Sequence, residues 1–296
     1  MTTAQQRCET LSQILKGGRV AIAPSAYDAL SAMLIERAGF PVVHISGSGA
    51  HRSYGFGDVG LLTLTEQVAR ATNIADSVSI PVIADAETGH GNAVNVVRAV
   101  REFERAGVAG IHIEDQETPK RPTQDGAQAG FISVAEFVGK IAAAAETRID
   151  PNFTIIARMD ARGEPYEQMV ERGRAVAEAG ADALWIGVAR EDITRIAGDV
   201  GKPMVGIPRR PHMTFQMYED IGYRIALVPG ALAQAACWAM DGTLRALKEQ
   251  GTETDFFATL PGMDDVGAWF RAIGTASVND IEGRYMGGSA PARSHA

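Results

Sequence analysis

Short apolar runs recur along the chain, and each is followed by a polar or glycine-rich turn and then by a segment with helical spacing. The runs are nearly continuous in Val, Ile and Ala, which is typical of strands buried on both faces of a parallel sheet. Amphipathic helices are predicted between them, for example over 94–106 and 166–179. The predicted strands are 20–23, 42–45, 82–84, 110–113, 154–157, 183–186, 203–207 and 224–228.

Eight strands that alternate with helices predict the fold class α/β and, within it, a (β/α)8 barrel of the TIM type. A doubly wound open sheet is the alternative, but no GxGxxG motif follows the first strand and eight regular units fit closure better. In such a barrel the chemistry lies at the C-terminal ends of the strands. The residues directly after each strand are therefore the candidates for a functional site.

After residue 228 only helical periodicity continues, which predicts helices over 231–250, 266–273 and 278–285. The end of the chain is rich in Gly, Ser, Ala and Pro, a composition that disfavours a packed structure. The predicted organisation is a barrel over 1–240, a C-terminal helical extension over 241–286 and a disordered tail over 287–296.

The composition is that of an ordinary globular protein, with 46% hydrophobic and 22% charged residues and a formal net charge of -8. The negative charge and the lack of a basic run argue against nucleic-acid binding. No window approaches the length and apolarity of a membrane span. The two cysteines, Cys8 and Cys237, lie far apart and form no CxxC pair. We expect a cytoplasmic protein without nucleic-acid or membrane partners.

Acidic side chains follow two successive predicted strands. Asp85 and Glu87 come directly after the third strand, and Glu114 and Asp115 end the fourth. Acids at the ends of neighbouring strands lie side by side, and they repel each other unless a cation neutralises them. Oxygen ligands suit Mg²⁺ or Mn²⁺ rather than zinc. The alternative is that these acids cap the helices that follow, but two adjacent acidic strand ends favour a metal site.

Other strand ends offer groups that can bind an anion. Residues 46–49, Ser-Gly-Ser-Gly, present hydroxyls and backbone N–H groups that suit a carboxylate or phosphate, although an ordinary turn has the same composition. Arg158 follows the fifth strand and can grip an anion with two hydrogen bonds. Its alternative role is an ion pair with Asp160 or Glu114. Asp58, on a glycine-rich loop, is a further candidate whose alternative role is an Asx turn.

The segment 117–131 is a long polar connection after the fourth strand, and loops of this length usually have a function. We interpret it as a lid that brings Lys120 and Arg121 over an anionic ligand. A solvated flexible loop is the alternative. The histidines near strand ends lack the spacing of a zinc site, and His112, inside the fourth strand, is expected to be a hydrogen-bonded core residue.

Taken together, the motifs at these strand ends resemble those of the isocitrate lyase / phosphoenolpyruvate mutase superfamily over about residues 20–236. The motifs that carry the resemblance are Pro24-Ser25-Ala26-Tyr27-Asp28-Ala29-Leu30, Ser46-Gly47-Ser48-Gly49, Asp85-Ala86-Glu87-Thr88-Gly89, His112-Ile113-Glu114-Asp115-Gln116, Pro119-Lys120-Arg121 and Ile156-Ala157-Arg158-Met159-Asp160-Ala161. The resemblance implies a (β/α)8 barrel whose last helix is exchanged between the subunits of a homotetramer or homodimer. It also implies cleavage or formation of C–C or P–C bonds through enolate intermediates, with Mg²⁺ bound to the substrate.

The same resemblance implies roles for individual residues. Asp85 binds the metal directly, while Glu87 and Glu114 reach it directly or through water. The substrate carboxylate is held by Ser46, Gly47 and Ser48. Arg158 contacts that carboxylate or the developing enolate oxygen, so that a cation and an arginine together stabilise the new charge.

Several positions depart from the family pattern. Glu87 stands where a second Asp is usual, and His44 stands where a Tyr is common. The lyases' Cys after Lys-Arg is replaced by Pro122, so the proton donor is left open among His44, Tyr54 and His212. After the seventh strand Arg209 and Arg210 make the site more positive, and Arg209 is expected to bind an anionic part of the substrate.

We therefore predict a Mg²⁺-dependent lyase that cleaves a C–C bond of a small anionic 2-oxo- or 2-hydroxy-carboxylic acid. Aldol-type cleavage and decarboxylation both remain open, and the candidate catalytic residues are Arg158, Lys120, Asp58 and His44. A phosphonopyruvate-type mutase or hydrolase is one alternative. A non-catalytic barrel that binds a carboxylate is the other.

Overall fold

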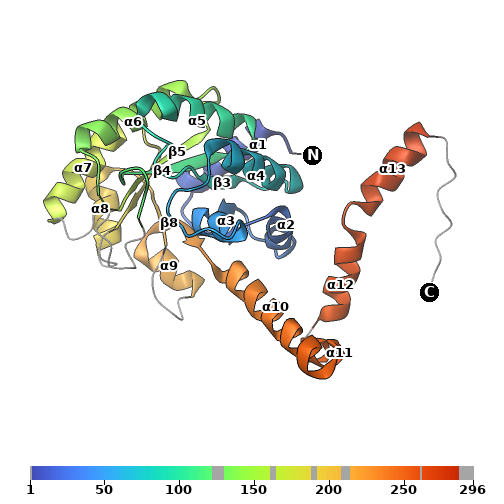
Figure 1. Cartoon of the computed structure of the whole chain (residues 1–296). Coiled ribbons are helices and arrows are strands. Elements are labelled where there is room, and N and C mark those ends of the chain that lie inside the picture. Colours follow the sequence, from blue (N-terminus) through green and yellow to red (C-terminus); the bar gives the residue numbers. More distant parts are fainter. Residues whose placement is uncertain are drawn as a thin grey trace. The chain divides into compact units, whose positions relative to one another are not determined.

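Eight parallel strands form a closed barrel in which each strand pairs with the next and β1 pairs with β8 (Figure 1). The computed structural model describes residues 2–121, 130–160, 165–187, 192–207, 214–260 and 262–286. The strands are β1 (Ala21–Ala26), β2 (Val43–Ile45), β3 (Val82–Asp85), β4 (Gly110–Glu114), β5 (Thr154–Met159), β6 (Ala183–Ile186), β7 (Met204–Gly206) and β8 (Tyr223–Val228). The predicted TIM-type barrel is confirmed.

Helices surround this barrel and bury their apolar faces against it (Figure 1). They are α1 (Ala4–Lys16), α2 (Ala29–Arg37), α3 (Gly47–Ser53), α4 (Leu64–Ser77), α5 (Ala93–Arg105), α6 (Val134–Thr147), α7 (Tyr166–Glu178), α8 (Ile193–Val200) and α9 (Phe215–Ile221). Helix α5 is representative, because Asn92 caps its N-terminus and Val96, Val100 and Phe103 recur at helical spacing on its buried face. The hydrophobic pattern therefore accounts for both layers.

Polar side chains fill the inside of the barrel near the C-terminal ends of the strands. Ser25 on β1 pairs in register with His44 on β2, and Arg158 on β5 pairs with Trp185 on β6. The rings of His112 on β4 and Trp185 lie 5.1 Å apart. Because alternate residues of a strand face the same side, His112 and Glu114 both point inward from β4. The strand period thus stacks a histidine layer beneath the acids.

The remaining helices are α10 (Ala231–Gln250), α11 (Thr254–Ala258), α12 (Met263–Ala272) and α13 (Thr275–Tyr285). By its internal contacts the chain divides into Met1–Gln234 and Ala235–Ala296, so the boundary falls inside α10. Within the second unit Trp238 packs near Phe256, with ring centroids 6.2 Å apart. The domain limits predicted above stay a prediction, and residues 287–296 lie outside the described residues.

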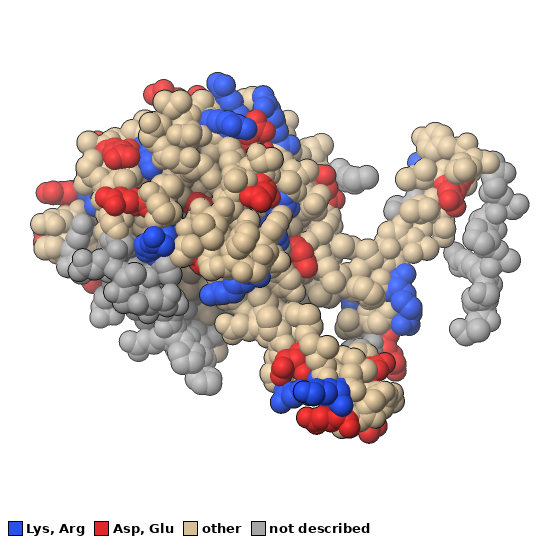
Figure 2. All heavy atoms as spheres, viewed as in Figure 1, with Lys and Arg blue, Asp and Glu red and all other residues tan. Residues whose placement is uncertain are grey.

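Charged side chains of both signs are interspersed on the face shown in Figure 2, among the residues that the structure describes there. The view shows a mixed surface rather than one extended basic area. None of the described helices is long and apolar enough to cross a membrane.

Candidate functional site

Two acidic side chains converge where β3 ends. Asp85 is the last residue of β3, and Glu87 follows with a positive φ of 55°. A left-handed conformation is unfavourable for a residue with a Cβ and is often found at functional sites. It lets the Glu87 backbone N–H donate to Asp85 Oδ1 at 2.9 Å. The turn therefore holds the first carboxylate while it brings in the second.

Gly47, at the start of α3, makes room for both acids. Its N–H donates to Asp85 Oδ2 at 3.2 Å. A Cβ built at this position would lie 2.6 Å from Asp85 Oδ2 and 2.7 Å from Glu87 Oε1. The two oxygens therefore face the same small space, which only a glycine leaves open.

We expect Gly47→Ala to weaken divalent-cation affinity by about tenfold or more, because the added methyl group must push the two carboxylates apart. Gly139→Ala is the matched control, since a Cβ there meets nothing within 4 Å. Titration of both purified variants with Mn²⁺, followed by electron paramagnetic resonance, measures the difference. Equal affinities would contradict the crowded geometry.

Lys120 reaches into the acids from the loop after β4. Its Nζ lies 2.9 Å from Asp58 Oδ1 and 4.0 Å from Glu114 Oε1, and it also forms an ion pair with Glu87. The side chain is buried. Burial alone would lower the pKa of Lys120, but the carboxylates around it, Glu114 first, raise that pKa well above its usual value. Lys120 is therefore a fixed positive charge and not a base.

Arg158 closes the opposite side of the acids. Its guanidinium lies 2.9 Å from Glu114 Oε2 and 3.9 Å from Asp85 Oδ2. Two further hydrogen bonds, of 3.1 and 2.7 Å, join it to both oxygens of Asp160. The guanidinium carbon also lies 4.3 Å from the centre of the Trp185 ring. Arg158 thus makes both ion pairs named as its alternative role, and they fix it at the edge of the acidic group.

The site carries more negative than positive charge. Its carboxylates are those of Asp58, Asp85, Glu87, Glu114 and Asp160, and its cations are Lys120 and Arg158. Burial and the neighbouring Asp85 charge raise the pKa of Glu87 to about 8. Burial likewise raises the pKa of Glu114 to about 7, against the opposing effect of Arg158. For Asp85, the surrounding cations outweigh burial and lower the pKa.

A divalent cation fits this excess of carboxylate charge. Both oxygens of Glu114 and one oxygen of Glu87 are buried, and the partners that the described residues give them are the ion pairs with Lys120 and Arg158, two cations for a larger number of carboxylates. Buried carboxylate oxygens need a partner, and a hard cation is the partner that such oxygens prefer. Asp85, Glu87 and Glu114 are the residues that would hold it.

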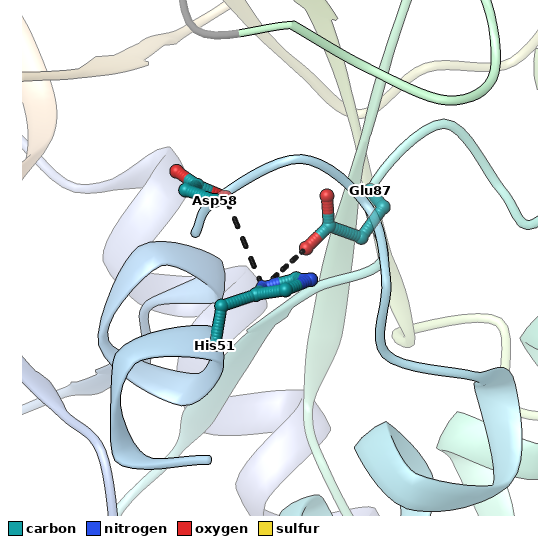
Figure 3. A group of neighbouring side chains, drawn as sticks. All are labelled: His51, Asp58 and Glu87. Carbon is teal, nitrogen blue, oxygen red and sulfur yellow. Dashed lines mark ion pairs between the residues drawn. The ribbon is translucent and has the colours of Figure 1, made fainter. Parts of the chain in front are cut away.

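A second group of potential ligands overlaps the first. This group consists of His51, Asp58 and Glu87 (Figure 3). Each offers one ligand atom, and these three atoms all lie within 4.8 Å of one another. His51 comes from α3, and its Nδ1 donates to Gly47 O at 2.8 Å while its Nε2 accepts from Leu62 N at 3.3 Å. Both ring nitrogens are therefore occupied, which favours the three carboxylates over His51 as ligands.

Titration of the metal-free site should couple cation binding to pH. Because the pKa values of Glu87 and Glu114 are raised towards the neutral range, a bound cation competes with protons for these two groups. We expect divalent-cation affinity to rise by about tenfold or more per pH unit between about pH 6 and pH 8, since up to two protons are displaced. Calorimetry in two buffers of different ionisation enthalpy would measure the released protons.

The folding stability of the metal-free protein should also depend on pH. The folded-state pKa of Glu87 is raised above its usual 4.5, so its contribution to metal-free stability is lost as the pH rises towards about 8. The gap between melting temperatures with Mg²⁺ and with EDTA should therefore widen over this range. A gap that narrows with rising pH would contradict these assignments.

The predicted substrate-binding turn lies beside the acids. Ser46 caps α3, where its Oγ accepts from Gly49 N at 3.2 Å, and a hydroxyl can also donate. Ser48 accepts a hydrogen bond from Arg52. The structure thus brings Ser46 and Gly47 next to Asp85. Arg209 and His212 lie outside the described residues, as do residues 122–129 of the predicted lid.

His44 lies below the acids and not among them. It is buried, its Nδ1 is 2.7 Å from Ser25 Oγ, and its Nε2 is 3.0 Å from His112 Nε2. The expected hydrogen-bonded role of His112 inside β4 is confirmed. Sequence reasoning did not single out Trp185 as the neighbour of Arg158 or His51 as a buried support. Strand alternation and register are the signals that place Trp185 beside Arg158.

The fold and site define an α/β barrel protein with a buried group of carboxylates, a lysine and an arginine at its strand ends. Residues 11–248 match the family described as phosphoenolpyruvate phosphomutase. The chain belongs to this family, and the resemblance to the isocitrate lyase / phosphoenolpyruvate mutase superfamily is confirmed.

Individual relatives resemble the chain over most of its length. The 2,3-dimethylmalate lyase of Eubacterium barkeri is 40% identical over 94% of this chain and 98% of its own. The 2-methylisocitrate lyase of Aeropyrum pernix is 37% identical over 84% and 82%. A solved structure of phosphonopyruvate hydrolase with oxalate and Mg²⁺ has a TM-score of 0.82 at 32% identity, covering 97% of this chain and 100% of its own.

Proposed function

We propose that the chain is a Mg²⁺-dependent lyase that cleaves a C–C bond of a small 2-oxo- or 2-hydroxy-carboxylic acid. The observation that carries the proposal is the buried group of Asp85, Glu87 and Glu114 between the cations of Lys120 and Arg158. The similarity to a 2,3-dimethylmalate lyase and a 2-methylisocitrate lyase supports the reaction class. The expectation of an enzyme, and of a carbon–carbon lyase in particular, accords with them.

The residues of the site have different roles in such a cleavage. When bound, Mg²⁺ supplies a Lewis acid that polarises a carbonyl or hydroxyl oxygen and stabilises negative charge. Arg158 binds the substrate carboxylate or the enolate oxygen, and Asp160 and Trp185 hold the guanidinium in place. The backbone N–H groups and the Ser46 hydroxyl at the start of α3 also bind the substrate carboxylate.

Lys120 and Asp58 form an ion pair beside the acids, with Asp58 the more exposed of the two. Their ion pair of 2.9 Å keeps the ammonium near the acids, where it offsets charge that develops during bond cleavage. Since Lys120 stays protonated, we assign it an electrostatic role and assign no role in removing a proton. We assign the delivery of the final proton to none of the described residues.

Phosphonopyruvate hydrolysis is a second candidate function. The similarity to the phosphonopyruvate hydrolase structure with oxalate and Mg²⁺ favours it, because the same acids and Arg158 would serve an enolate formed by P–C cleavage. A non-catalytic carboxylate-binding barrel is the third. The complete set of Asp85, Glu114 and Arg158 argues against it.

A panel of substrates separates these functions. Dimethylmalate and other alkylmalates, methylisocitrate, oxaloacetate and phosphonopyruvate are each incubated with the protein, with Mg²⁺ and with EDTA, and the released oxo acid and phosphate are measured. We expect Mg²⁺-dependent oxo-acid release from at least one carboxylic acid. Phosphate release alone would support the hydrolase. No turnover together with no thermal shift by Mg²⁺ would overturn the enzyme proposal.

We also propose a homotetramer or homodimer located in the cytoplasm. Large apolar side chains of the second unit are exposed in the single chain, among them Trp238 at 63%, Leu244 at 65% and Phe270 at 58%. A second copy of the chain would cover these side chains, as the proposed exchange of C-terminal helices requires. Analytical ultracentrifugation tests this, since a monomer at micromolar concentration would contradict it.

A further inference from the structure

A chain of buried polar side chains runs inside the barrel from β1 to β3. Ser25 Oγ is 2.7 Å from His44 Nδ1, and His44 Nε2 is 3.0 Å from His112 Nε2. His112 Nδ1 in turn lies 3.6 Å from Asp85 Oδ1. All four side chains are buried, with exposed fractions between 0 and 7%. We propose that this chain is a directional positioning relay for Asp85, with His44 as its central residue, which deepens the metal site of the proposed function and rests on it.

The two facing nitrogens can share only one proton. Two protonated Nε2 atoms at 3.0 Å would repel each other, and two unprotonated ones would leave facing lone pairs. The two rings stack at an angle of 26°, with centroids 5.3 Å apart. Burial, and then the neighbouring His112, lower the pKa of His44 to about 3, in agreement with a neutral ring. Both imidazoles are therefore neutral, and one of them donates to the other.

The carboxylate of Asp85 selects the direction. If His112 donated from Nε2, its Nδ1 lone pair would point at Asp85 Oδ1 in a buried space. If His44 donates instead, the His112 proton sits on Nδ1 and faces the carboxylate. The described residues give His112 Nδ1 no hydrogen bond, and the Asp85 carboxylate lies 3.6 Å from it, so the negative charge favours a proton on Nδ1 over a buried lone pair. His44 Nδ1 then accepts from the Ser25 hydroxyl.

This direction determines how Asp85 is held. Its Oδ1 accepts from Glu87 N at 2.9 Å and faces His112, while its Oδ2 accepts from Gly47 N at 3.2 Å. N–H groups therefore approach both oxygens, and the carboxylate is fixed with its charge intact. Outer groups of this kind typically change metal affinity or activity by about 10- to 100-fold.

The same contacts show that His44 cannot donate a proton directly to a substrate. Both of its ring nitrogens are occupied, and the ring is only 3% exposed. His44 acts on the site through His112, so it is a positioning residue. Ser25, one strand away, sets the His44 tautomer in the same way.

Two amide substitutions separate the link to His112 from the link to Ser25. Glutamine places an amide near the position of Nε2, so His44→Gln can still donate to His112. Asparagine reaches only the position of Nδ1, so His44→Asn keeps the Ser25 contact and loses the donor to His112. We expect His44→Asn to bind Mn²⁺ about tenfold or more weakly than the wild type, and His44→Gln to stay within about threefold. Equal affinities of the two variants would overturn the relay.

Nitrogen-15 NMR of labelled histidines in the wild-type protein reads the direction without any metal or substrate. We expect His44 to carry its proton on Nε2 and His112 on Nδ1, with signals assigned from the His44→Gln variant. A proton on Nε2 of His112, or a charged ring at neutral pH, would overturn the proposal. If the wild type bound no Mn²⁺, the proposed function would fail, and the tautomers alone would decide whether the relay exists.

Discussion

Asp85→Ala is expected to lose Mg²⁺ binding and at least about 10³-fold of the lyase activity, which corresponds to several kcal/mol of transition-state stabilisation. Asp85 is the acid whose pKa is lowered while those of Glu87 and Glu114 are raised, so it carries the charge that the cation meets first. Its removal also withdraws the acceptor of the Glu87 and Gly47 N–H groups.

The fold should survive this change. Losing one of several buried like charges offsets the loss of its hydrogen bonds, so we expect the metal-free melting temperature to stay within a few degrees of wild type. Asp85→Asn, which keeps the shape, should lose cation binding as well. Asp76→Ala, on the exposed side of α4, is the control and should keep both activity and binding. Full activity of Asp85→Ala, measured by oxo-acid release, would refute the metal assignment.

Arg158→Lys is expected to lower kcat/KM by about 10²- to 10³-fold, because lysine cannot reproduce the paired hydrogen bonds to Asp160 and reach Glu114 at once. Lysine also loses the stacking on Trp185. The positive charge is kept, so the effect isolates geometry from charge. Steady-state kinetics on the substrate identified from the panel measures it.

Arg148→Lys provides the matched control. Arg148 follows α6 at the opposite end of β5, where it pairs with Asp182 at 2.5 Å and donates to Phe153 O at 2.9 Å. This substitution should lower thermal stability modestly and leave kcat/KM within about twofold, because Arg148 lies at the end of β5 away from the strand-end acids. A similar loss of kcat/KM in both variants would indicate that Arg158 supports only the fold.

The barrel could be predicted because each strand is marked by its own apolar run, which can be recognised without knowing which strand it pairs with. The run at 82–84 is found as Val82–Asp85, and that at 183–186 as Ala183–Ile186. Helix α3 was not predicted, because Ser46, which caps it, and Gly47 and Gly49 in its first turn are residues that favour turns. There, the Ser46 cap outweighs low helix propensity.

The acids of the site were predictable because Asp85 and Glu114 each end a strand, and β3 and β4 are neighbours both in sequence and in the barrel. The contact between His44 and His112 was not, because it joins β2 to β4 across the inside of the barrel, past β3. Such a contact depends on register and barrel curvature, which single-strand patterns do not encode. The same holds for the position of Lys120, which a loop carries back to Glu87.

The central claim is that Asp85, Glu87 and Glu114 form a divalent-cation site. Crystals of the whole protein soaked with Mn²⁺ and oxalate, measured for anomalous scattering, test it most directly. We predict one strong peak bonded to an Asp85 oxygen at about 2.0–2.2 Å, with Glu87 and Glu114 bound directly or through water. A peak bonded to His51 and away from Asp85, or no peak at the strand ends, would contradict it.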